Sequence, residues 1–422
     1  MSKEDTSNAY SHITPQRRWF VVCLLSLGMI IAYIDRANLS VAVALPEFKQ
    51  QFHLTDTQRG LLTSSFFWSY ALLQIPAGFI VDRYGVKIPY AIGFLFWSSM
   101  SVLMAFAGNI YQIVALRILL GFGEAVVTPA SMRWIRFNVA ERQRGLAVGI
   151  YMAGTKYGPA IGVPLATLLV QRFDWQNMFI MLGLGSLLWL IPWMTLVKGD
   201  DKQLEAAAQL RTGGVPMAFS EVWKTPLIYG VIIGTFSYNY FVYFCMTWLP
   251  AYFKENRGFS LEKMGSYTMF SFGGMATVAI LAGYVADKLI DQGWDPVRVR
   301  KGFTIAGLLV ASTELLGVMT DSPDMAAYIA IFSLSGLGLA TANYWALTQL
   351  MIPGAAAGRI AGVQNFASNM AGVVAPMLTG YLKEKTGSYD APMQTILVFL
   401  LMGVAAYVFL VQRKYAPGVK EA

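Results

Sequence analysis

The sequence predicts an all-α membrane protein with twelve transmembrane helices. Hydrophobic residues make up 56% of the 422 residues and charged residues 13%, and the mean hydropathy is +0.50. This composition fits a bilayer better than water. Apolar stretches of about 20 residues, the length a helix needs to cross the hydrocarbon, recur along the whole chain. The expected spans are 19–45, 60–81, 88–107, 110–132, 144–170, 177–197, 225–252, 265–286, 302–320, 325–351, 359–382 and 391–412.

A repeated motif divides the chain into two halves. Gly78-Phe-Ile-Val-Asp82-Arg83 closes the second span, and Gly283-Tyr-Val-Ala-Asp287-Lys288 closes the eighth, at the corresponding place in the second half. The repeat predicts two pseudo-symmetric six-helix bundles, 1–197 and 225–422, joined by a cytoplasmic linker, 198–224. Halves related by an axis along the membrane normal bind a substrate between them near the midplane and work by rocking.

The basic charge is distributed as in a membrane protein. The net charge is +8, and most Lys and Arg lie on the side of the N-terminus, which is the bias that orients cytoplasmic loops. We therefore expect both termini in the cytoplasm and no nucleic-acid partner. The first apolar run is too long for a signal-peptide core, and the short loops favour a bacterial inner membrane.

The cysteines and histidines indicate no disulfide, metal site or proton relay within the spans. Cys23 and Cys245 lie in separate spans and indicate neither a disulfide framework nor a metal site. His12 and His53 lie outside the spans, so a proton relay would depend on carboxylates. We expect no catalytic constellation, no metal and no cofactor, and hence no enzyme.

The first and fourth spans carry four charged residues at bilayer depth. Asp35 and Arg36 are in the first span, and Arg117 and Glu124 are in the fourth. Such a group costs about 2.5–3.5 kcal/mol at the helix centre, so it normally has a partner and marks a transport path. Seven residues are almost two turns, so Arg117 and Glu124 share a face, too far apart for a direct pair but able to exchange a partner. Asp35 and Arg36 diverge by about 100°.

The motif at the end of the second span resembles the loop signature of the major facilitator superfamily. Its first copy reads Gly78-Phe-Ile-Val-Asp82-Arg83-Tyr-Gly85-Val-Lys87. We expect Gly78 and Gly85 to let helices approach closely, and Asp82 to pair with a cation or helix end on the neighbouring bundle. The predicted cytoplasmic gate comprises Gly78, Asp82, Arg83, Gly85, Lys87, Gly283, Asp287 and Lys288.

The first and fourth spans together resemble the anion:cation symporter family. The motifs are Tyr33-Ile-Asp35-Arg36-Ala-Asn38-Leu and Arg117-Ile-Leu-Leu-Gly121-Phe-Gly123-Glu124-Ala-Val-Val-Thr-Pro129. This family includes sugar-acid permeases, vesicular glutamate transporters and sialin. The resemblance implies that Asp35 and Glu124 carry protons, that Arg36 holds the substrate carboxylate and that Arg117 tunes Glu124.

Further polar residues within the spans are candidate substrate contacts. Tyr33, Tyr70, Trp345 and Asn365 fall where the related sugar-acid permeases contact substrate. Aromatic and amide side chains also serve as interface anchors or join helices, and this alternative stays open for each. The other candidates are Gln74, Thr155, Lys156, Tyr240 and Asn343.

The fifth span departs from the sugar-acid permease pattern. It reads Gly154-Thr155-Lys156-Tyr157-Gly158-Pro159-Ala-Ile-Gly162, with a lysine where many of these permeases have an uncharged residue. Its Gly-Pro-x-x-Gly core resembles the antiporter motif of drug exporters, although such residues also allow close packing and a kink. Lys156 either recognises a second anionic group or a dense hydroxyl face on the substrate, or it pairs with Asp35 or Glu124 or extends towards a helix end.

The function predicted is proton-coupled symport by rocker-switch alternating access. The expected cargo is a small organic anion, either a sugar acid (hexonate, hexarate or hexuronate) or a related dicarboxylate, and the expected partners are protons and the lipid bilayer, with the protein a monomer. A proton-driven drug exporter or an anion exchanger of the same fold is the first alternative. A non-transporting membrane sensor is the second.

Overall fold

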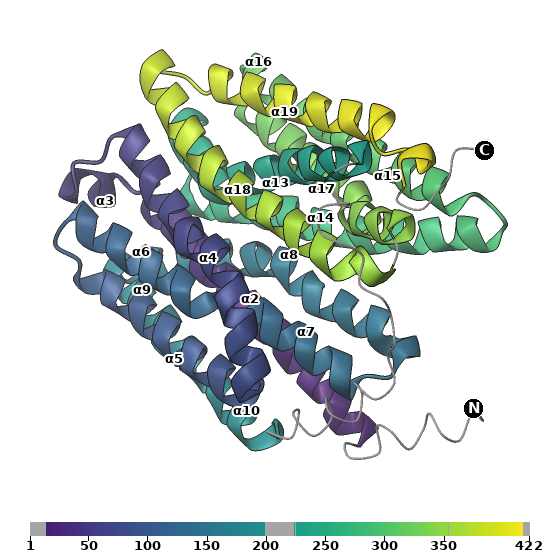
Figure 1. Ribbon diagram of the computed structural model, residues 1–422. Helices are drawn as coiled ribbons and strands as arrows, with labels where there is room; N and C mark the ends of the chain where they lie inside the picture. The colour runs from purple at the N-terminus through teal and green to yellow at the C-terminus, as the bar shows by residue number, and fades with distance from the viewer. Residues whose placement is uncertain (1–13, 199–222, 224, 353, 417–422) are drawn as a thin grey trace. The chain divides into compact units, whose positions relative to one another are not determined.

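Helices account for each predicted span (Figure 1). The computed structural model describes residues 14–198, 223, 225–352 and 354–416. The spans correspond to α2 (Pro15–Ala42), α4 (Asp56–Tyr84), α5 (Lys87–Leu103) with η1 (Met104–Phe106), α6 (Ile110–Glu124) with α7 (Val127–Asn138), α8 (Glu141–Arg172), α9 (Trp175–Ser186) with η2 (Leu187–Trp189) and α10 (Leu190–Leu196), α13 (Pro226–Ala251) with η3 (Tyr252–Asn256), α14 (Leu261–Asp291), α15 (Pro296–Ala311) with η4 (Ser312–Leu315) and α16 (Leu316–Met319), α17 (Pro323–Met351), α18 (Gly354–Thr386) and α19 (Asp390–Phe409).

The all-α membrane fold is therefore confirmed. Ten helical stretches among the described residues are long and apolar enough to cross a bilayer, and α8 and α18 complete the predicted set. Short helices α3 (Pro46–Gln51) and η5 (Arg413–Tyr415) lie outside the spans. The predicted linker, 198–224, falls outside the described residues except for 198 and 223.

The chain forms two compact units. Unit 1 comprises residues 1–38 and 65–213, and unit 2 comprises residues 39–64 and 214–422. Helices α2 and α4 each contribute to both units. The segment 39–64 thus packs with unit 2, although the sequence repeat assigns it to the first half.

Unit 1 is held together by an aromatic core and by glycines. Tyr90 packs on Trp189 and Trp193 with ring centroids 5.0 and 4.6 Å apart, and Trp189 Nε1 donates to the Leu24 carbonyl at 2.8 Å. At Gly121 of α6, a Cβ would lie 2.3 Å from the Phe66 carbonyl oxygen, so only glycine lets α6 approach α4 this closely. This contact holds α6 directly against α4 within unit 1.

The fourth span is interrupted next to its carboxylate. Helix α6 ends at Glu124, two turn residues follow, and α7 begins at Val127. Pro129 has no backbone N–H to donate to the Ala125 carbonyl, which explains the break. Glu124 therefore lies at the end of a helix rather than in the middle of one.

In unit 2, helix α17 packs along α14 and α15, and α13 packs along α18 and α19. Glycines again allow the contacts: a Cβ at Gly338 would lie 2.6 Å from the Met275 carbonyl oxygen, and one at Gly307 would lie 2.7 Å from the Ala340 nitrogen. Helix α13 continues into a π-helical turn, η3, which ends the seventh span. Such turns are rare in proteins overall, and those that occur are often found at functional sites.

Candidate functional site

Arg36 and Glu124 form a buried ion pair in unit 1. Arg36 Nε donates to Glu124 Oε2 at 2.9 Å, and Nη2 lies 2.8 Å from the same oxygen. The two side chains are 2% and 0% exposed. Glu124 is thus paired with the residue predicted to anchor substrate.

Three aromatic rings surround the Arg36 guanidinium. Its Cζ lies 4.4 Å from the Tyr33 ring centroid, 4.5 Å from Phe66 and 4.4 Å from Tyr70. Phe66 and Tyr70 also stack on each other, with centroids 5.1 Å apart. Each such contact attracts a cation to the ring face, so the rings position Arg36 independently of its carboxylate partner.

Asp35 faces another set of groups. Its Oδ1 accepts hydrogen bonds from Ser101 Oγ at 3.0 Å and from Asn38 Nδ2 at 3.4 Å, and its backbone carbonyl accepts one from Arg117 Nη1 at 3.1 Å. Asp35 and Arg36 therefore point to different partners, as their divergence around the helix predicts.

Asp35 and Glu124 each have one carboxylate oxygen that takes no part in these contacts. Asp35 Oδ2 and Glu124 Oε1 are buried and accept no hydrogen bond from the protein in the part of the chain that the structure describes. Arg117 is also buried, and within the same part of the chain it forms no ion pair closer than 4.0 Å. The four charged residues therefore form one ion pair, Arg36–Glu124, beside Asp35 and Arg117, which are linked through the Asp35 backbone carbonyl.

The glycines of the fifth span pack against α2. A Cβ at Gly154 would lie 2.8 Å from the Ser26 carbonyl oxygen, one at Gly158 would lie 2.3 Å from Tyr33 Cβ, and one at Gly162 would lie 2.9 Å from Ile34 Cγ1. The Gly-Pro-x-x-Gly core is thus accounted for by close helix packing that fixes Tyr33. Lys156 and Gln74 are partly exposed, and Thr155 Oγ1 donates to the Met152 carbonyl of its own helix at 2.8 Å.

The remaining substrate-contact candidates are in unit 2. The Tyr240 ring packs against Phe399 with centroids 4.4 Å apart, and Trp345 and Asn365 are partly exposed. Asn343, also in unit 2, differs from these residues because its side chain is buried and already hydrogen-bonded. It is buried, its Oδ1 accepts from Arg300 Nη1 at 3.2 Å and its Nδ2 donates to the Leu339 carbonyl at 2.9 Å.

Each acid of the repeated gate motif forms an ion pair with an arginine. Asp82 pairs with Arg133 of α7 at 2.5 Å, and Asp287 pairs with Arg300 of α15 at 2.6 Å. Each arginine belongs to the same unit as its acid, whereas the sequence analysis placed the partner of Asp82 on the neighbouring bundle. The expectation therefore differs from the contact observed, because α7 brings an arginine of the same bundle to the end of α4.

The glycines of the gate motif differ from one another. The expected close approach at Gly78 is wrong for the part of the chain that the structure describes, since a Cβ there would meet none of its atoms within 4 Å. Gly85 has φ +82° and directly follows the last residue of α4, and its N–H donates to the Val81 carbonyl. It ends the helix in a left-handed conformation that favours glycine. Among the other gate residues, Arg83 lies over the Tyr84 ring, and Lys87 begins α5.

Sequence reasoning missed the neutral residues around the four charges. Ser101 contacts Asp35 and Phe66 contacts Arg36, yet nothing in the local sequence distinguishes them from other serines and phenylalanines in the spans. It also missed an ion cluster in unit 2, because its members lie at span ends, where charged residues ordinarily face water or headgroups.

Comparisons with known proteins agree with this architecture. The sequence profile of the Major Facilitator Superfamily matches residues 25–376. The chain belongs to the major facilitator superfamily. The D-xylose-proton symporter structure has the same fold, with a TM-score of 0.74 at 17% identity over 94% of this chain and 97% of that chain. A bacterial homologue of the human lysosomal transporter Spinster, in an inward-facing conformation, gives a TM-score of 0.72 at 18% identity over 94% and 96%.

Curated relatives match over nearly their whole length. The D-galactonate transporter of Escherichia coli is 29% identical, covering 94% of this chain and 96% of its own. The probable sulfoacetate transporter of Cupriavidus necator is 31% identical over 93% and 94%, and the hexuronate transporter of Bacillus subtilis is 29% identical over 91% and 90%. The protein is therefore a multi-pass membrane transporter rather than an enzyme, and it is similar to transporters named for organic anions.

Proposed function

We propose that this transporter imports a small organic anion together with protons. The proposed cargo is a sugar acid (hexonate, hexarate or hexuronate) or a related dicarboxylate, moved by rocker-switch alternating access across a bacterial inner membrane, with both termini in the cytoplasm. The relatives named for galactonate, hexuronate and sulfoacetate support this class of cargo.

The observation that carries the proposal is the Arg36–Glu124 pair. A guanidinium can hold a carboxylate through two parallel hydrogen bonds, but here Nε and Nη2 are both directed at Glu124 Oε2. A substrate carboxylate must therefore compete with Glu124 for Arg36. Protonation of Glu124 removes its negative charge and weakens the competition, so a proton and a substrate favour each other's binding.

The aromatic rings make this exchange of partners feasible. Breaking a buried ion pair by removing one charge is costly because it leaves the other uncompensated. Tyr33, Phe66 and Tyr70 would keep the Arg36 guanidinium in place during the exchange. Substrate then supplies the missing negative charge.

Asp35 is the proposed second proton site. It is one residue from Arg36 and is joined to Arg117 through its own backbone carbonyl. A change in the position of α2 would therefore alter the surroundings of Asp35, Arg36 and Arg117 together. Arg117 is proposed to tune the two acids electrostatically.

The test is uptake of labelled D-galactonate into proteoliposomes under an imposed inward proton gradient. We expect wild type to accumulate the anion, and Asp35→Asn and Glu124→Gln to lose accumulation while retaining some counterflow exchange, because each amide keeps the size of the acid but cannot titrate. Asp324→Asn, which alters an acid in an exposed ion pair, is the matched control and should behave as wild type.

Three outcomes would contradict the proposal. Concentrative uptake by both amide variants would remove Asp35 and Glu124 from the coupling. Proton-driven movement only in the opposite direction would make the protein an exporter. No flux for any of galactonate, galactarate, glucuronate or tartrate, with binding retained, would indicate a sensor.

A further inference from the structure

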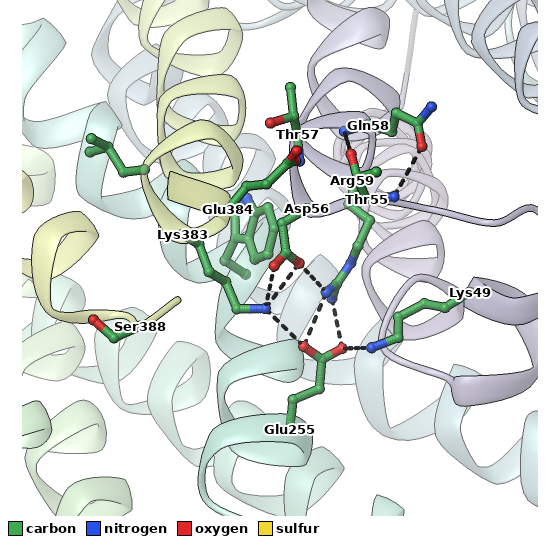
Figure 2. Close-up of polar contacts among 12 residues, drawn as sticks. Lys49, Thr55, Asp56, Thr57, Gln58, Arg59, Glu255, Lys383, Glu384 and Ser388 are labelled. Carbon is green, nitrogen blue, oxygen red and sulfur yellow. Dashed lines mark hydrogen bonds and ion pairs between the residues drawn. The ribbon is translucent and has the colours of Figure 1, made fainter. Parts of the chain in front are cut away.

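Five charged side chains form a continuous ion cluster in unit 2, which we call the 49–383 cluster (Figure 2). It contains three cations and two acids, and Figure 2 shows the Glu255 carboxylate directed at all three cations. Its members are Lys49 of α3, Asp56 and Arg59 at the start of α4, Glu255 of η3 and Lys383 near the end of α18.

Glu255 is the centre of the cluster. Its Oε1 lies 3.1 Å from Lys49 Nζ and 3.0 Å from Arg59 Nη2, and its Oε2 lies 3.2 Å from Lys383 Nζ. Asp56 completes the ring, at 2.8 Å from Arg59 Nη1 and 2.9 Å from Lys383 Nζ. Every cation therefore has at least one carboxylate partner, and two of them share both acids.

The cluster is shielded from water more than an ordinary surface ion pair. Arg59 is 2% exposed and Glu255 17%. The Arg59 Cζ lies 4.8 Å from the Trp248 ring centroid, and Lys383 Nζ lies 5.0 Å from that of Tyr389. Exposed ion pairs contribute little to stability, but a network shielded by aromatic rings resists separation, because each charge left behind loses its partner.

Beside the ions, helices α4 and α18 touch through their backbones. A Cβ at Gly60 would lie 2.4 Å from the Pro376 carbonyl oxygen, and one at Gly380 would lie 2.3 Å from the Asp56 carbonyl oxygen. Thr57 N also donates to Glu384 Oε2 at 2.8 Å. Only glycine fits at these two positions, so the contact is tight without any side chain.

The cluster joins parts of the sequence that alternating access would have to separate. Lys49, Asp56 and Arg59 precede the repeat motif of the first half, whereas Glu255 and Lys383 belong to the second half. With both termini in the cytoplasm, the segment after the first span and the end of the seventh lie on the outer side of the membrane. Rocking that opens the outer side moves these segments apart.

We infer that the 49–383 cluster, with the Gly60 and Gly380 backbone contacts, is the outer gate of the transporter. This inference rests on the proposed rocker-switch mechanism. The gate is closed in this structure. Opening it requires loss of the ion pairs of Glu255 and separation of α4 from α18, so these contacts set the balance between outward-open and outward-closed states.

The test measures that balance directly by double electron–electron resonance. Spin labels are placed on the exposed residues Gln51 of α3 and Lys385 of α18, each changed to Cys in a C23S/C245A background. We expect Glu255→Gln to raise the ratio of long to short label distances about tenfold, between the effects of exposed and of buried pairs. Gly380→Ala, which removes no charge, should shift the ratio in the same direction.

Matched controls separate gating from general damage. Lys383→Arg keeps the charge, Gly362→Ala alters a glycine of α18 whose Cβ would meet no atom within 4 Å, and Asp324→Asn removes an exposed acid of unit 2. All three should keep the wild-type distance distribution. Lys49→Gln removes the most exposed cation of the cluster. It should shift the ratio of label distances in the same direction by a smaller amount, with little loss of folding stability.

A wild-type distance distribution in Glu255→Gln, Gly380→Ala and Lys49→Gln would overturn the inference and leave the cluster a static contact. Uptake of D-galactonate by wild type is measured in parallel. Label distances that shift in the variants, while wild type takes up none of galactonate, galactarate, glucuronate and tartrate, would retain the gate and refute the proposed function. Normal uptake with no shift in any variant would refute the gate alone.

Discussion

Replacing Glu124 by Gln tests the competition for Arg36. The substitution removes a carboxylate that is 0% exposed and has two guanidinium nitrogens within 2.9 Å of one oxygen. Removing one partner of a buried pair costs about 3–5 kcal/mol. Three ring contacts of about 0.5–2 kcal/mol each still hold the guanidinium, so we expect the free energy of unfolding to fall by an amount at the lower end of that range.

The effect on substrate binding has the opposite sign. In wild type, D-galactonate binding should weaken as pH rises, because the ionised Glu124 competes for Arg36. Where one proton is taken up with each substrate, affinity falls by up to about tenfold per pH unit. Glu124→Gln abolishes this competition, so its affinity at high pH should exceed that of wild type, and its linkage should be smaller by about one proton.

Isothermal titration of the purified protein at several pH values measures the D-galactonate affinity and the number of protons linked to binding. Thermal unfolding without ligand measures the loss of stability. Asp324→Asn serves as the control and should reproduce the wild-type slope. An unchanged slope of log affinity against pH in Glu124→Gln would refute the reasoning, since the proton linked to substrate binding would then reside elsewhere.

Three further variants probe the surroundings of this pair. Arg36→Lys keeps the charge but loses the planar fork, so we expect D-galactonate affinity to fall about 30-fold or more, corresponding to about 2 kcal/mol; near-normal binding would place the anchor elsewhere. Lys156→Gln should lower the ratio of galactarate to galactonate affinity if the ammonium reads a second carboxylate, and an unchanged ratio would exclude that role. Gly158→Ala forces α8 away from Tyr33 and should destabilise the protein by about 1–3 kcal/mol and weaken binding, whereas Gly149→Ala on the same helix, where a Cβ meets no atom within 4 Å, should do neither in thermal-shift and binding assays.

The fold was largely predictable because span length and hydropathy are local properties. Every expected span corresponds to a helix, and the divergence of Asp35 and Arg36 follows from helix geometry alone. The partner of Glu124 was not predictable in the same way. Arg36 reaches Glu124 from a different helix, α2, and spacing along one helix carries no information about which other helix packs against it.

The role of glycines also depended on tertiary context. Gly78 and Gly158 both belong to motifs with family precedents, yet only Gly158 lies where a neighbouring helix leaves no room for a side chain. The 49–383 cluster was not foreseen for a related reason. Its charges are distributed over four segments near span ends, and only the pairing of residues up to 327 positions apart in the sequence makes them a network.

That separation in sequence has a consequence for how the protein is made. Arg59 is synthesised 196 residues before Glu255. Before Glu255 is made, Arg59 can pair only with the other acid of the cluster, Asp56, one turn away on the same helix. During membrane insertion the parts of α2 and α4 that belong to unit 2 therefore lack the later helices of that unit, and Arg59 has neither Glu255 nor the Trp248 ring beside it. The segment 39–64, unlike the rest of the first six helices, packs with unit 2, so its final packing awaits the synthesis of α18.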